Sequence, residues 1–241
     1  MKKHHWYRWT FGLLAVLAVG MAGGAGLTTA LQLQQTPIDI RLDDVLFPSR
    51  LQFHYHSKVL LDVFNNGSPG EFSTVRANVP DGAGSLVIGD TTYNLLQFHF
   101  HTPSEHLIDG ARFPMEMHLV HRADDGTLLV VGVFIERGHK HHELDEIFDA
   151  LPQQVDEHRA VPHFNLRKLL PHHLDSFRYI GSLTTPPFTE GVRWVVLAEP
   201  IELSDEQIQA FMDLFPLGNS REEQPLNGRT VVGVDGENDD D

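Results

Sequence analysis

Cysteine is absent from this chain of 241 residues. Its absence excludes disulfide bonds and thiolate metal sites, so imidazole and carboxylate groups would have to hold any transition metal. Basic residues are also scarce: 18 Lys and Arg stand against 33 Asp and Glu, which gives a formal net charge of −15. Because nucleic acid binding requires a basic surface, we expect no nucleic acid partner. The hydrophobic fraction of 41% is that of a globular chain with a substantial core.

Charged residues are also missing from Phe11 to Ala30, an Ala/Gly-rich run that follows a basic segment with Lys2, Lys3 and Arg8. This pattern is typical of an export signal, and we expect cleavage after Ala30. The alternative is an uncleaved membrane anchor, because about 20 apolar residues can span a bilayer. The many glycines favour cleavage. In either case we expect the folded part outside the cytoplasm, in the periplasm or extracellular, and in contact with a membrane only if the segment stays attached.

Histidine is plentiful by contrast, with 16 residues, and the stretch 95–121 reads LLQFHFHTPSEHLIDGARFPMEMHLVH. It contains two strand-like segments around a turn-rich piece. Since side chains alternate along a strand, Gln97, His99 and His101 share one face, as do Glu116 and His118. If both strands lie in one sheet, three imidazoles can converge. Three nitrogen ligands leave one tetrahedral position open, as in a catalytic zinc site.

The polar neighbours of these histidines support a metal site. Gln97 and Glu116 each stand two residues from a histidine on the same face, where they can accept its second N–H and fix the ring. An H-x-H pair alone would fit a sheet whose imidazoles merely hydrogen-bond one another. The added E-x-H and the Ser104-Glu105-His106 sequence favour metal binding.

The segments QFHFHTPSEH and PMEMHLVH closely resemble the bacterial branch of the α-class carbonic anhydrases, as does SLTTPP at 182–187. The resemblance implies a mainly β (α+β) single domain, residues 31–235, with a large twisted, mostly antiparallel central sheet and short peripheral helices. It implies reversible hydration of carbon dioxide to bicarbonate and a proton via zinc-bound hydroxide. The partner is then a small-molecule substrate, and a homodimer is left open. Residues 236–241 predict an acidic disordered tail.

The resemblance also implies residue roles. His99, His101 and His118 become the Zn²⁺ ligands, with Gln97 and Glu116 as their hydrogen-bond partners. Thr184 accepts a hydrogen bond from the zinc-bound hydroxide and donates its own hydroxyl hydrogen to Glu105. Asn66 belongs to the water network. The substrate pocket is lined by Val120, Val130, Leu183, Thr185, Val192 and Trp194.

Two departures from the family bear on activity. Ser68 stands where many active members carry a proton-shuttling histidine, and serine cannot titrate near neutral pH. We therefore expect impaired internal proton transfer, with His54 and His56 as candidate substitutes. The QTPIDI motif at 35–40 follows the signal-like run closely, so we expect the family's preceding flank to be missing.

The missing flank motivates one alternative, a non-catalytic zinc- or partner-binding relative. A cupin-like metal protein is a third reading, in which SLTTPP would have no role. Outside the site, the patterns predict short helices at 144–151, 166–170 and 204–215.

Overall fold

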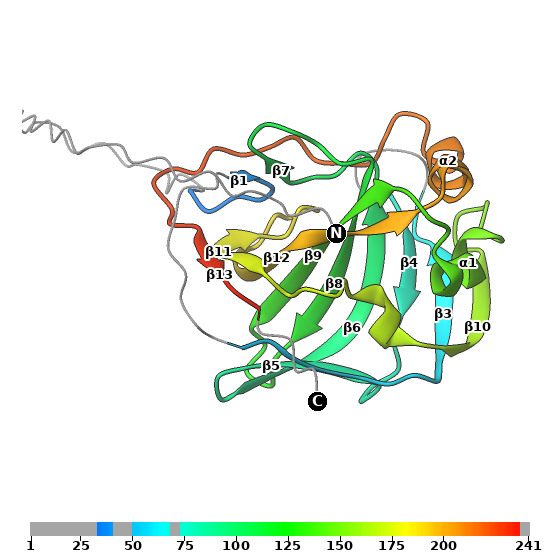
Figure 1. Ribbon diagram of the computed structural model, residues 1–241, viewed down its shortest axis with the longest axis horizontal. Helices are drawn as coiled ribbons and strands as arrows, with labels where there is room; N and C mark the ends of the chain where they lie inside the picture. The colour runs from blue at the N-terminus through cyan, green and yellow to red at the C-terminus, as the bar shows by residue number, and fades with distance from the viewer. Residues whose placement is uncertain (1–32, 41–49, 68–72, 237–241) are drawn as a thin grey trace, which may run out of the picture. The chain divides into compact units, whose positions relative to one another are not determined.

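Strands form most of the regular structure. The computed structural model describes residues 33–40, 50–67 and 73–236, which belong to one compact unit. Within these ranges one 11-stranded sheet and two α-helices are present (Figure 1), which confirms the predicted mainly β fold. The predictions for residues 1–30, Ser68 and 237–241 lie outside the described residues, and the domain limits stay a prediction.

The large sheet is mostly antiparallel. Its main path runs in the order β10-β3-β4-β6-β8-β9-β12-β11-β13, β5 also pairs with β6, and β2 pairs with β5. β9 and β12 are parallel, and β1 and β7 form a separate parallel pair. The strands are β1 (Asp39–Ile40), β2 (Gln52–Tyr55), β3 (Val59–Asn65), β4 (Val75–Asn78), β5 (Gly84–Ile88), β6 (Thr91–His101), β7 (Leu107–Ile108), β8 (Met115–Arg122), β9 (Leu128–Arg137), β10 (His158–Phe164), β11 (Ser176–Ser182), β12 (Glu190–Leu203) and β13 (Val232–Val234).

Alternation along the central strands separates a core face from a site face. On β6, Phe98 and Phe100 are fully buried in the main core. The ring of Phe100 packs 5.1 Å from that of Phe148, in helix α1 (His142–Phe148), and 6.0 Å from that of Phe211, in helix α2 (Asp205–Leu214). The two helices thus cover one face of this strand, and the histidines that alternate with the phenylalanines point to the other.

The helices lie close to the predicted positions. Ser204 and Gln207 form a capping box at the start of α2, as the sequence predicts. Helix α1 begins two residues before the predicted Leu144, because the His141 side chain accepts a hydrogen bond from the Leu144 N–H and caps the helix. The helix predicted at 166–170 is a 3₁₀ turn, η1 (Leu166–Leu169). None of the helices in the described ranges is long and apolar enough to cross a membrane.

Candidate metal centre

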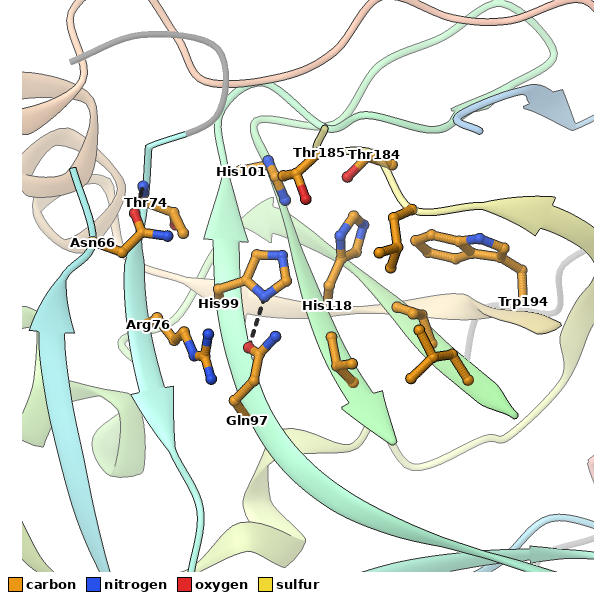
Figure 2. A pocket seen from close by; sticks show the side chains of 14 residues that line it. Asn66, Thr74, Arg76, Gln97, His99, His101, His118, Thr184, Thr185 and Trp194 are labelled. Carbon is orange, nitrogen blue, oxygen red and sulfur yellow. Dashed lines mark hydrogen bonds between the residues drawn. The ribbon is translucent and has the colours of Figure 1, made fainter. Parts of the chain in front are cut away.

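Three histidines converge on the face of the sheet opposite the helices. His99 and His101 lie on β6 and His118 on β8, with His99 and His118 as Cα partners across the two strands. The ring centres lie 5.0, 5.3 and 4.6 Å apart, and one nitrogen from each ring lies within 4.8 Å of the others. Figure 2 shows the three rings gathered around one space. The group could hold a metal ion.

Two of these rings are held by the polar residues on the same strands. His99 Nδ1 donates to Gln97 Oε1 at 2.8 Å, and His118 Nε2 donates to Glu116 Oε1 at 2.9 Å. Each bond fixes the tautomer, so His99 Nε2 and His118 Nδ1 keep a free lone pair.

His101 has a partner that sequence reasoning missed. Its Nδ1 donates to the backbone carbonyl of Asn219 at 3.0 Å, although the two residues are 118 positions apart. The Asn219 side chain secures this segment by accepting from Thr102 N at 2.7 Å and donating to the Phe100 carbonyl at 3.0 Å. His101 Nε2 is buried and has no hydrogen-bond partner among the described residues. A buried nitrogen without a partner is costly unless a ligand completes it, so the donor set fits a metal ion.

Burial also prepares these rings for coordination. It lowers the pKa of His101 to about 4 and that of His118 below its ordinary value. The pKa of His99 is lowered well below the ordinary value by burial and then by the neighbouring imidazoles. The rings are therefore neutral at pH 7, which is the form that binds metal.

Glu116 is the centre of a buried polar network beside the histidines. Its Oε2 accepts from the backbone N–H groups of Glu105 and His106 at 2.9 and 2.8 Å. Its Oε1 accepts from His106 Nδ1 at 2.7 Å as well as from His118. Burial alone would raise the pKa of Glu116, but His106 and His118 hold it well below its ordinary value. The carboxylate is therefore ionised.

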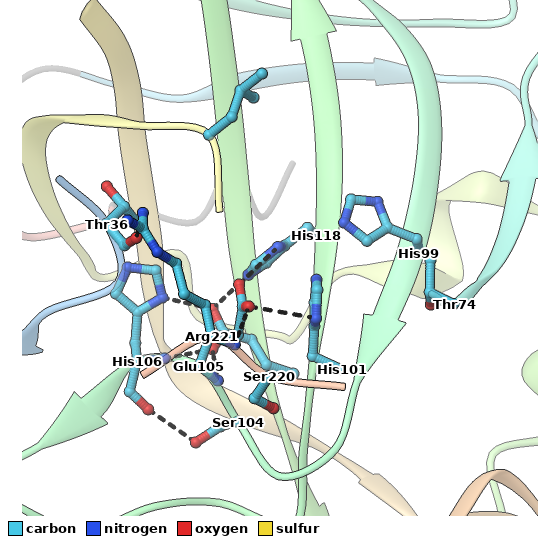
Figure 3. A network of polar contacts seen from close by, with 12 residues as sticks. Thr36, Thr74, His99, His101, Ser104, Glu105, His106, His118, Ser220 and Arg221 are labelled. Atoms are coloured by element: carbon cyan, nitrogen blue, oxygen red, sulfur yellow. Dashed lines mark hydrogen bonds and ion pairs between the residues drawn. The ribbon is translucent and has the colours of Figure 1, made fainter. Parts of the chain in front are cut away.

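His106 is a second residue whose role the sequence did not reveal. Its Nε2 lies 2.6 Å from the hydroxyl of Tyr179 on β11, so it links Glu116 to another strand. Atoms of His106, Glu116 and His118 also lie within 4.8 Å of one another. Since these atoms already bond to one another, this group does not need a metal. Figure 3 shows His106 and Glu105 beside His118.

Glu105 is fully buried next to the three rings. Its Oε1 accepts from the Arg221 N–H at 2.8 Å, and its Oε2 lies 3.8 Å from His118 Nδ1. Burial raises the pKa of Glu105 to about 7, against smaller lowering effects of His118, of the Arg221 N–H and of the Thr184 hydroxyl. The Oε2 atom has no hydrogen-bond partner among the described residues, although the Thr184 hydroxyl lies close enough to lower the pKa of this carboxyl.

A cavity of about 220 Å³ opens over the histidines. Most of the predicted pocket residues line it together with the three rings: Asn66, Gln97, Val120, Val130, Leu183, Thr184, Thr185 and Trp194. Val192, also predicted to line the pocket, does not line this cavity. It is buried in a cluster with Val130 and Trp194. Thr74, Arg76 and Leu128 line the cavity without having been predicted. The first two come from the segment at β4, whose place beside β6 the sequence alone does not give.

Comparison with known proteins defines the class. The family model described as eukaryotic-type carbonic anhydrase matches residues 26–234. A carbonic anhydrase of Pectobacterium carotovorum is 38% identical over 201 residues, which cover 82% of this chain and 79% of that protein. A carbonic anhydrase of Nostoc sp. is 40% identical over 205 residues, covering 83% and 75%.

Solved structures agree. An α-carbonic anhydrase from Thermovibrio ammonificans, in complex with the inhibitor sulfanilamide, matches with a TM-score of 0.76 at 36% identity. The match covers 84% of this chain and 88% of that chain. The Photobacterium profundum α-carbonic anhydrase has the same score and identity, covering 84% and 90%. The chain belongs to the α-carbonic anhydrase family. It is thus an enzyme of carbon dioxide hydration, as the sequence analysis predicted.

Proposed function

We propose that this chain hydrates carbon dioxide with a zinc ion held by His99, His101 and His118. The observation that carries the proposal is the set of three neutral imidazoles, each with one nitrogen bonded to protein and the other turned to a common space. Zinc supplies Lewis acidity in such a site and lowers the pKa of water to about 7, a value known for carbonic anhydrases in general. Bicarbonate and a proton are the products.

The chain's own groups orient the reaction. The Gln97 amide, the Asn219 carbonyl and the Glu116 carboxylate hold the three rings with the required nitrogens free. When the Thr184 hydroxyl donates a hydrogen bond to Glu105, its oxygen can accept a hydrogen bond from the attacking water. That contact turns a lone pair of the water toward carbon dioxide. The free Oε2 of Glu105 is available for this bond.

Apolar side chains provide the place for a neutral substrate. Val120, Val130, Leu183 and Trp194 line the cavity beside the rings, where they can hold carbon dioxide and exclude excess water. Thr185 lines the same cavity and is proposed to position substrate and bicarbonate. Val192 would act only indirectly, by packing behind Val130 and Trp194.

Proton release is the step we propose to be impaired. Ser68, outside the described residues, cannot act as a titrating relay, so a buffer molecule must collect the proton. Stopped-flow hydration by the zinc-loaded protein should show a rate that rises steeply with buffer concentration. Replacing Ser68 by His should reduce that dependence, and a primary sulfonamide should inhibit both proteins. Absence of hydration with zinc bound would refute the proposed function, and a high rate independent of buffer would refute the impaired transfer.

We also propose that residues 1–30 direct export and are removed, which places the enzyme in the periplasm or outside the cell. The support is the basic segment followed by the uncharged apolar run. Cell fractionation with mass determination of the mature protein tests this. A full-length chain in the membrane fraction would favour the anchor instead. A homodimer stays a prediction, tested by the molar mass in solution.

A further inference from the structure

Arg76 places a positive charge in the cavity. It lies on β4 as the Cα partner of His99 on β6, is half-buried and lines the cavity. Figure 2 shows its side chain extending from β4 toward Gln97 and His99. Its guanidinium group therefore faces the space through which substrate, product and buffer must pass.

A scaffold from neighbouring strands holds the guanidinium in this position. Arg76 Nε donates to Asn78 Oδ1 at 2.9 Å, and Asn78 Nδ2 donates to Asp62 Oδ2 at 3.1 Å. The other oxygen of Asp62 is occupied by His158 Nδ1 at 2.8 Å. The guanidinium carbon lies 5.8 Å from the ring centre of Phe64, which stacks on His158 at 4.7 Å. The arginine is thus supported on one side and open on the other.

The charge is not neutralised in the cavity. Among the described residues, Arg76 forms no ion pair and uses only its Nε in a hydrogen bond. The described lining of the cavity includes no carboxylate. Burial lowers the pKa of Arg76 while Asp62 raises it, and arginine stays charged near neutral pH. In a protein of net charge −15, this site is locally attractive to anions.

We propose that Arg76 makes the cavity select an anionic proton acceptor, such as inorganic phosphate, over an acceptor that becomes a cation, such as 1-methylimidazole. The inference rests on the proposed function, because hydration releases a proton that a buffer must collect. A neutral acceptor gains a positive charge beside the guanidinium, whereas phosphate dianion keeps a negative charge after protonation. One charge interaction of this kind near a protein surface corresponds to a preference on the order of tenfold.

Kinetics with two buffers of closely matched pKa test the proposal. At saturating carbon dioxide, the zinc-loaded protein should turn over about tenfold faster with phosphate than with 1-methylimidazole at equal concentrations of their basic forms. Arg76→Gln should remove most of this preference, and Arg76→Lys should keep it. Arg122→Gln removes the same charge from an exposed position outside the cavity and should leave the ratio of the phosphate rate to the 1-methylimidazole rate unchanged. Equal rates with both buffers in the parent protein, or an unchanged ratio in Arg76→Gln, would overturn the proposal.

Calorimetric titration of inorganic phosphate into the same proteins adds a measurement independent of turnover. Phosphate should bind the parent and Arg122→Gln alike and about tenfold more weakly to Arg76→Gln. Equal affinity in all three would overturn the role of Arg76. If no protein hydrates carbon dioxide, the proposed function fails, while the phosphate titration still decides whether Arg76 attracts anions.

Discussion

Replacing Glu116 by Gln is the sharpest perturbation of the histidine site, because it changes one charge at nearly constant volume. Glu116 accepts four hydrogen bonds, from the N–H groups of Glu105 and His106 and from the rings of His106 and His118. A glutamine has only one accepting oxygen. If its oxygen faces the rings, its amide hydrogens meet two backbone donors. If its amide faces the rings, His118 must carry its proton on Nδ1, the atom needed for metal.

Burial of the charge competes with these bonds. A neutral side chain would avoid the cost of a buried carboxylate, and replacing buried charges can be stabilising. His106 and His118 hold the pKa of Glu116 well below its ordinary value in spite of burial, so the interactions of this carboxylate with its neighbours outweigh its desolvation, and we expect the substitution to lower the free energy of unfolding. Losing two charge-assisted bonds, each worth about 1.5–3 kcal/mol, gives an expected destabilisation of about 3–6 kcal/mol. Loss of a ligand's partner typically weakens metal affinity by about 10–100-fold.

Urea unfolding of the metal-free protein and zinc titration against a chelating dye measure the two effects. Glu222→Gln removes the same charge from an exposed position and should change neither result. Destabilisation of less than about 0.5 kcal/mol in Glu116→Gln, the scale of an ordinary surface substitution, together with unchanged zinc affinity, would refute the reasoning.

Three further predictions concern other parts of the site and its core. His121 is fully buried, donates to the Leu119 carbonyl and accepts from the Tyr55 hydroxyl. Burial lowers its pKa from 6.5 to about 4. Its contribution to the free energy of unfolding is therefore complete above pH 6.5 and is lost as pH falls toward 4. The loss is about 3 kcal/mol, and urea unfolding of His121→Gln should show a shallower acid limb than the exposed control His54→Gln. Gly132→Ala should weaken zinc affinity measured with a chelating dye, since a Cβ there would lie 2.8 Å from Glu116 Oε1; unchanged affinity would contradict this. Chelation should lower the melting temperature of the parent protein, by the equivalent of about 2.7 kcal/mol when zinc had been present at 100 times its Kd, but should not change that of His101→Ala; an equal shift in both would argue against His101 as a ligand.

Local spacing explains why so much of the fold and site could be predicted. The alternation in QFHFH and MEMHL separates phenylalanine and methionine from histidine in any strand, and the structure buries Phe98 and Phe100 on one face with the histidines on the other. Gln97 and Glu116 hold rings two residues away, a distance at which strand geometry alone sets the contact. The capping box at Ser204 is local in the same way. These features need no knowledge of which strands are neighbours.

The unpredicted features all depend on contacts between residues that lie far apart in the sequence. Asn219 reaches His101 across 118 positions, and nothing near either residue indicates the contact. Gly132 is needed because β9 places it opposite His118 and against Glu116. Val192 has the strand pattern of a pocket residue, yet it is buried in the cluster that includes Val130 and Trp194 and does not line the cavity. Arg76 reads as an ordinary half-exposed strand residue until β4 is known to pair with β6. A motif can therefore identify the candidate metal ligands, whereas the positive charge of Arg76 in the cavity follows only from the neighbouring strand.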